Sequence, residues 1–149
     1  MSISNWNDYG YGIRTDNLQI KSEESLGELV SMAPKLKAEM DAYFEEQEIS
    51  ELTMEDYLGY DTEYDYQLAS LMRLVIKEAE GIDLVPCDDL NAWNYLLYMP
   101  SYPWRMSETD LRLTEEKLDE IFQKYFSVNL ALFSALLADI FCFSSACKR

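Results

Sequence analysis

Hydrophobic residues recur every three or four positions along several stretches of the chain, which is the spacing of amphipathic helices. The first stretch follows Ser22, a residue type that favours the N-cap, and acidic residues occupy its first turn. Pro34 is expected to end this helix and to begin a second one that extends to about Gln47. Near the other end of the chain, Thr114 followed by two glutamates predicts a helix that runs through Tyr125.

Two more helices are expected between these. Thr53 is the expected N-cap of a short helix that Gly59 ends. Thr62 is the expected N-cap of a longer helix over residues 63–79, where apolar residues form a broad face. Gly81 follows directly and predicts the end of that helix.

The spacing of apolar residues then changes to two, which predicts strands. Residues 82–86 and 92–99 are expected to form a β-hairpin around a turn at 88–91, with a helix over the same residues as the alternative. One face of the second strand carries Trp93, Tyr95, Leu97 and Met99. We expect this face to pack on the core. Shorter strands are predicted at 11–14 and 18–20, on either side of a turn.

The pattern as a whole predicts an α+β fold, in which residues 1–129 form one predominantly helical, acidic domain with a small antiparallel sheet around 82–99. Residues 130–149 differ in composition, because Asp139 is the only charged residue before Lys148. We expect an apolar C-terminal helix or tail that packs on the domain or on a partner. A membrane anchor is disfavoured, since a carboxylate inside a span costs about 2.5–3.5 kcal/mol.

The composition excludes several kinds of site. The chain has no histidine, which rules out a Ser-His-Asp or Cys-His site and any zinc site that uses histidine. Cys87, Cys142 and Cys147 show no Cys-x-x-Cys spacing, so we expect reduced thiols. No enzymatic activity, metal or cofactor is expected. Residues 1–11 lack the basic and apolar regions of a signal peptide, which predicts a cytoplasmic protein.

The charge points to a kind of partner. With 28 acidic and 12 basic residues the net charge is −16, which argues against direct binding to nucleic acid and favours a basic protein surface. Residues 38–72 contain no basic residue and carry eleven of the acids. These candidate partner-binding residues are Glu39, Asp41, Glu45, Glu46, Glu48, Glu51, Glu55, Asp56, Asp61, Glu63 and Asp65. Tyr102 and Trp104, in a loop stiffened by two prolines, are candidate binding anchors.

No family motif is present, but in size and charge the chain resembles the small acidic proteins of phages, mobile elements and toxin–immunity pairs. This resemblance implies a protein that blocks a basic nuclease or another nucleic-acid-handling protein, as an anti-CRISPR or a nuclease immunity protein does, by mimicking nucleic acid. Two alternatives stay open. One is a small carboxylate-based or metal-dependent enzyme, and the other is an assembly subunit that docks through its apolar C-terminal tail.

Overall fold

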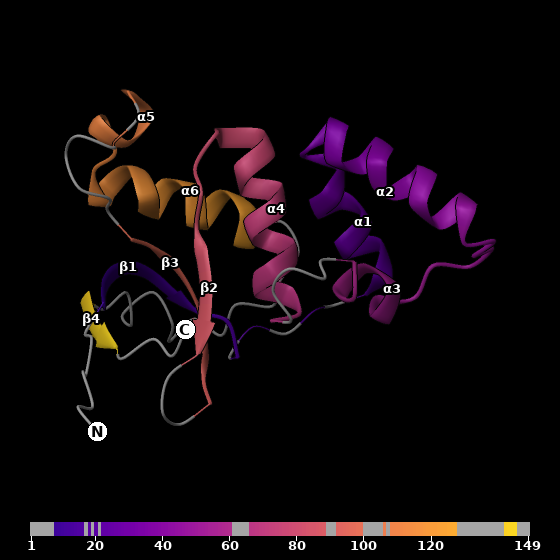
Figure 1. The fold of residues 1–149 in the computed structure, drawn as a ribbon, viewed down its shortest axis with the longest axis horizontal. Helices are drawn as coiled ribbons and strands as arrows, with labels where there is room; N and C mark the ends of the chain where they lie inside the picture. The colour runs from indigo at the N-terminus through magenta and orange to yellow at the C-terminus, as the bar shows by residue number, and fades with distance from the viewer. Residues whose placement is uncertain are drawn as a thin grey trace, which may run out of the picture.

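The computed structural model describes residues 8–16, 18, 20, 22–60, 66–88, 92–99, 106, 108–127 and 142–145. Within them, helices α1–α6 and a four-stranded antiparallel sheet form one α+β domain (Figure 1). The fold class expected from the sequence, a predominantly helical domain with a small antiparallel sheet, is therefore confirmed.

The sheet has the strand order β2-β3-β1-β4. Strands β2 (Val85–Asp88) and β3 (Asn94–Tyr98) form the predicted hairpin. On its other side β3 pairs with β1 (Asp8–Arg14), and β1 in turn pairs with β4 (Cys142–Ser145). For the C-terminal segment, expected to be a helix or a tail, the structure describes only 142–145, which are extended and pair with β1 rather than helical. The rest of 130–149 lies outside the described residues.

A glycine allows β1 to approach β3 closely. A Cβ atom at Gly12 would lie 2.0 Å from the carbonyl oxygen of Leu96, so no other residue fits there without moving the backbone. Of the second strand expected at 18–20 the structure describes two residues: Ile20 forms an isolated β-bridge, and Leu18 belongs to no strand. Instead, the backbone N–H of Leu18 donates to the carbonyl of Thr15 at 3.1 Å, and the chain turns towards the first helix.

Local signals set the ends of the first helices. In α1 (Glu23–Ser31) the hydroxyl of Ser22 accepts from a backbone N–H, as predicted for the N-cap. Pro34 begins α2 (Pro34–Glu46), and its fixed φ suits the first position of a helix.

Short-range capping also holds α3 (Met54–Leu58). Thr53 and Asp56 form a capping box at its start, and Gly59 follows its last residue. Both ends of this helix are where the sequence predicted them.

The next helix begins later than predicted. Helix α4 (Leu68–Glu80) ends at Gly81, which has a left-handed φ of 70°, as expected. Its start was predicted at residue 63, but Gln67 has a φ of 50° and interrupts any helix that would pass through it. The expected N-cap, Thr62, lies outside the described residues.

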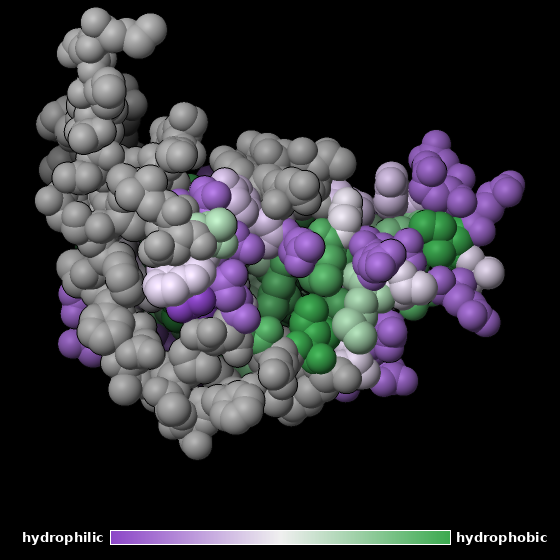
Figure 2. Space-filling model, turned by 90° about the horizontal axis from the view of Figure 1, so that it is seen from below, coloured by the Kyte–Doolittle hydropathy of each residue, from purple (hydrophilic) through white to green (hydrophobic). Residues whose placement is uncertain are grey.

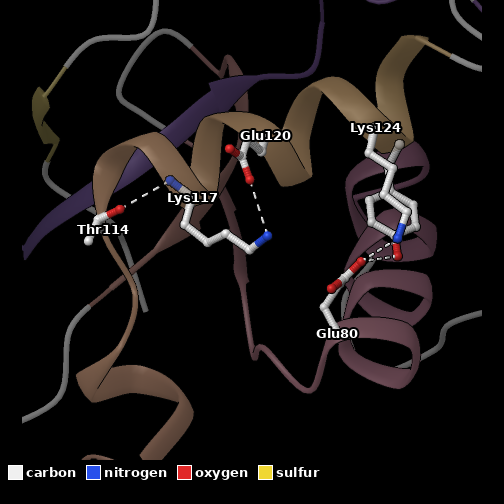
Figure 3. Close-up of polar contacts among 6 residues, drawn as sticks. Glu80, Thr114, Lys117, Glu120 and Lys124 are labelled. Carbon is white, nitrogen blue, oxygen red and sulfur yellow. Dashed lines mark hydrogen bonds and ion pairs between the residues drawn. The ribbon is translucent and has the colours of Figure 1, made fainter.

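The final helices lie beside the sheet. Helix α5 (Glu108–Leu111) was not predicted, whereas α6 (Glu115–Ser127) follows Thr114 as expected. The Thr114 hydroxyl accepts from the backbone N–H of Lys117 at 3.2 Å (Figure 3). The Tyr11 hydroxyl donates to Asp119 at 2.7 Å and ties β1 to α6. Burial and this hydrogen bond to a carboxylate raise the pKa of Tyr11.

Helix α4 is the centre of the core. It packs against α2 and α3 on one side and against β2 and β3 on the other (Figure 1). The prediction for the face of β3 is corrected here, because α4 covers the face that carries Leu96, which is completely buried. Tyr95 and Leu97 lie on the opposite face and form a second, smaller cluster with Cys87. Among the described residues, no helix is long and apolar enough to cross a membrane.

Candidate protein-interaction surface

The candidate site is the acidic surface, which we define as the side chains of Glu39, Asp41, Glu45, Glu46, Glu48, Glu51, Glu55 and Asp56. It extends over α2, the loop 47–53 and α3. All of these side chains are exposed except Asp56, which is half-buried. Figure 2 shows hydrophilic side chains gathered at the end of the molecule that α2 and α3 form. The other predicted partner-binding residues, Asp61, Glu63, Asp65, Tyr102 and Trp104, lie outside the described residues.

The acidic surface is not neutralised by the chain itself. Among its described members only Asp41 is in an ion pair, with Lys37 at 2.6 Å. Ion pairs are more frequent elsewhere in the described residues; Asp83, for example, pairs with Arg73 and Lys77, at 3.3 and 3.2 Å. Seven of the eight carboxylates of the acidic surface are therefore in no ion pair among the described residues.

The charges of α2 run against the dipole of the helix. Lys35 and Lys37 lie in its first turn, and Glu45 and Glu46 lie in its last turn, which contains no basic residue. A helix dipole favours the opposite order, by about 0.3–1 kcal/mol for each charge at low salt. The carboxylates at this end of α2 thus lower the stability of the fold.

The backbone conformation of Glu48 also lowers stability at the C-terminal end of α2. The backbone N–H of Ile49 donates to the carbonyl of Phe44 at 3.1 Å, and that of Glu48 donates to Glu45 at 3.0 Å. This is the Schellman arrangement, in which glycine is preferred at the left-handed position. Here Glu48 occupies that position with a φ of 57°, whereas the corresponding residue after α4 is Gly81.

An aromatic cluster underlies the acidic surface. The ring centroids of Tyr43 and Tyr60 lie 5.4 Å apart, and those of Phe44 and Tyr57 lie 5.9 Å apart, all edge to face. Phe44 is buried in the core, while Tyr43 is 45% exposed. Burial also raises the pKa of Tyr57. An exposed aromatic ring therefore lies among the carboxylates, on a rigid support.

Capping fixes the start of α3 and the charge of Asp56. Both the backbone N–H and the hydroxyl of Thr53 donate to the Asp56 carboxylate, each at 2.7 Å. These hydrogen bonds lower the pKa of Asp56, so this carboxylate stays charged to a lower pH than an ordinary aspartate.

The alternative of a small enzyme would require a cluster of metal-ligating or catalytic side chains. In the part of the chain that the structure describes, no group of three or more acidic or cysteine side chains could hold a metal ion. A cavity of about 260 Å³ is lined by Thr15, Asp16, Leu18, Ile20, Leu58, Tyr66, Gln67, Leu68 and Asn94. Asp16 is the one carboxylate among these, and it accepts from Arg14 at 3.1 Å and from the backbone N–H of Asn94 at 2.7 Å. It is engaged in holding the loop after β1.

A half-buried polar cluster was missed by sequence reasoning. Lys124 and the hydroxyl of Tyr125 both donate to one oxygen of Glu80, each at 2.6 Å, and join α6 to the end of α4 (Figure 3). Burial disfavours the charge on Glu80, but these hydrogen bonds outweigh it and lower its pKa. Burial and the bond to Glu80 raise the pKa of Tyr125. Lys124 and Tyr125 are 44 and 45 positions from Glu80, so no local sequence pattern predicts these contacts.

Comparison with known proteins gives no assignment, because no family model, no curated protein and no solved structure matches the chain. The acidic surface is therefore the feature of the molecule from which a function can be proposed.

Proposed function

We propose that this protein binds a basic, nucleic-acid-handling protein through its acidic surface and competes with nucleic acid for the same groove. One observation carries the proposal: the carboxylates at the end of α2 are exposed and largely unpaired, in positions where they lower stability. A cost of this kind is explained when a partner supplies the missing positive charge. The net charge of −16 would also accelerate the encounter with a basic partner.

The density of charge on α2 suits a nucleic-acid groove. Four acids lie between Glu39 and Glu46. At about 1.5 Å per residue this interval spans roughly 10 Å, or about one carboxylate per 3 Å. One DNA strand carries a phosphate about every 3.4 Å. Lysine and arginine side chains spaced for phosphates would therefore meet carboxylates at a comparable spacing, and the protein would act as an inhibitor, like anti-CRISPR and nuclease immunity proteins.

Affinity capture tests this proposal. The protein is immobilised and exposed at about 50 mM salt to a lysate of its native source, and bound proteins are eluted either with 500 mM salt or with nucleic acid. The bait is compared with the triple reversal Glu45→Lys/Glu46→Lys/Glu48→Lys. A matched control, Glu108→Lys/Glu115→Lys/Glu120→Lys, has the same net charge but changes exposed acids of α5 and α6.

We expect a nucleic-acid-binding protein that the native bait and the control capture, that the triple reversal fails to capture, and that salt and nucleic acid both release. Capture of such a protein by all three baits alike, or capture that resists both eluents, would contradict the proposal.

A further inference from the structure

Tyr43 is the most specific feature of the acidic surface. Its ring contacts Tyr60, with the planes at 78°, and Phe44, with the planes at 63°. Phe44 is only 4% exposed, so this support is anchored in the core. The ring is 45% exposed and is therefore presented to solvent in a defined orientation.

Carboxylates flank this ring along the helix. Glu39 precedes Tyr43 by four residues and Glu46 follows it by three, so both are its neighbours on the surface of α2. Both are exposed, and among the described residues neither is in an ion pair. A guanidinium can stack on an aromatic ring and donate hydrogen bonds to a carboxylate at the same time. A ring between two unpaired carboxylates therefore suits an arginine side chain.

The same arrangement occurs at a second place in the chain, where an arginine side chain is bound in it. The guanidinium of Arg14 lies 3.7 Å from the ring centre of Trp93, and its Nε donates to Asp16 at 3.1 Å. Arginine, aromatic ring and carboxylate are all present there, on the other side of α4. At Tyr43 the ring and the carboxylates are present, and no basic residue in the described part of the chain pairs with Glu39 or Glu46.

We infer that Tyr43, Glu39 and Glu46 form a receptor for an arginine side chain of a basic protein partner. The guanidinium would stack on the ring and donate paired hydrogen bonds to a carboxylate, which the compact, strongly hydrated ammonium of lysine does less well. This inference rests on the proposed function and deepens it, because it names the residue that the partner must present.

A second copy of the chain is a poor occupant. Apart from Lys35, every basic residue that the structure describes is already in an ion pair. Two chains of charge −16 would also repel each other. A different protein is therefore the better source of the complementary charge.

The test uses two probes of equal charge, a nona-arginine and a nona-lysine peptide, titrated calorimetrically into the intact protein at about 150 mM salt. We expect the arginine peptide to bind about two- to fivefold more tightly, the ratio that stacking on an exposed ring supports. Tyr43→Ala should abolish this preference, and Tyr43→Phe should retain it. Trp93→Ala, which removes an exposed ring outside the acidic surface, should leave the preference unchanged.

The outcomes separate the two proposals. Equal affinities for the two peptides, or a preference that survives in Tyr43→Ala, would overturn the arginine receptor alone. Binding of both peptides that is insensitive to Glu45→Lys/Glu46→Lys/Glu48→Lys would instead overturn the acidic surface as the interface. If Tyr43→Ala melts early, Tyr43→Leu keeps apolar volume against Tyr60 without a π face, and it should also lose the preference.

Discussion

Replacing Glu48 by glycine should stabilise the protein, although the change removes a side chain and adds no contact. Glu48 follows α2 with a φ of 57°, a conformation that glycine adopts freely and that other L-residues adopt at a cost of roughly 1–2 kcal/mol. The substitution also removes a negative charge from the C-terminal end of a helix, which adds about 0.3–1 kcal/mol.

One effect opposes this gain. Glycine loses more backbone freedom on folding than glutamate, by roughly 0.4–1 kcal/mol. The net expectation for Glu48→Gly is a gain of about 1 kcal/mol, or about 3 °C in melting temperature for a chain of this size. Glu48→Gln removes the charge and keeps the strained backbone, so it should gain only the electrostatic part. The reciprocal change Gly81→Ala, at a φ of 70°, should cost about 1 kcal/mol.

Urea denaturation followed by circular dichroism measures these differences, with the slope m checked to be constant. In about 1 M salt the gain of Glu48→Gln should disappear through screening, while that of Glu48→Gly should largely persist. A Glu48→Gly protein that is no more stable than Glu48→Gln under either condition would refute the argument that the backbone at this position is strained.

Three further predictions concern stability. Gly12→Ala should cost about 3 kcal/mol or more in chemical denaturation, because its Cβ would lie 2.0 Å from a backbone oxygen; Gly10→Ala, whose nearest side-chain atoms lie at 3.1 Å, should cost less than half as much. Thr53→Ala should cost about 1 kcal/mol by the same measurement, since the capping box is lost. Tyr125→Phe should cost about 1–2 kcal/mol at pH 7 through loss of its bond to Glu80. Because the folded-state pKa of Glu80 lies below its ordinary value of 4.5, stability from this carboxylate is present above that value and is lost as pH falls through the folded-state pKa. Unfolding curves of Tyr125→Phe and the native protein should therefore converge in acid, and a difference independent of pH would contradict the role of Glu80.

The sequence was informative wherever a short-range interaction decides the structure. Ser22, Pro34, Thr53, Gly59 and Gly81 each act on the backbone within a few residues, and the structure places helix ends at all of them. Such signals need no knowledge of distant partners.

Prediction from the sequence failed where contacts between distant segments determine the structure. Tyr11 pairs with Tyr98 and with Cys142, so neither the length of β1 nor the strand at the C-terminal end could be found from local spacing. Leu96 faces the core rather than Tyr95 because α4 covers that side of the sheet, which the alternation of residues along β3 does not reveal.

The candidate surface was predictable only in part. A count of acids along the chain locates the acidic surface. Which of these carboxylates are exposed and which form ion pairs depends on packing, and the proposed function depends on both. The left-handed backbone of Glu48 had no signal at all, because a helix end of this kind is predicted from a glycine. The support of Tyr43 by Tyr60 likewise depends on how α2 and the end of α3 meet.

Competition with nucleic acid tests the central claim most directly. A labelled single-stranded or duplex oligonucleotide is bound to the captured partner, and its fluorescence anisotropy is followed as the native protein, the triple reversal at Glu45, Glu46 and Glu48, or the matched control is added at about 50 mM salt. We predict that the native protein and the control displace the oligonucleotide, and that the triple reversal does so at least tenfold less effectively, mainly through a slower association rate. A ternary complex that retains the oligonucleotide, or equal displacement by all three proteins, would contradict the claim that the acidic surface takes the place of nucleic acid.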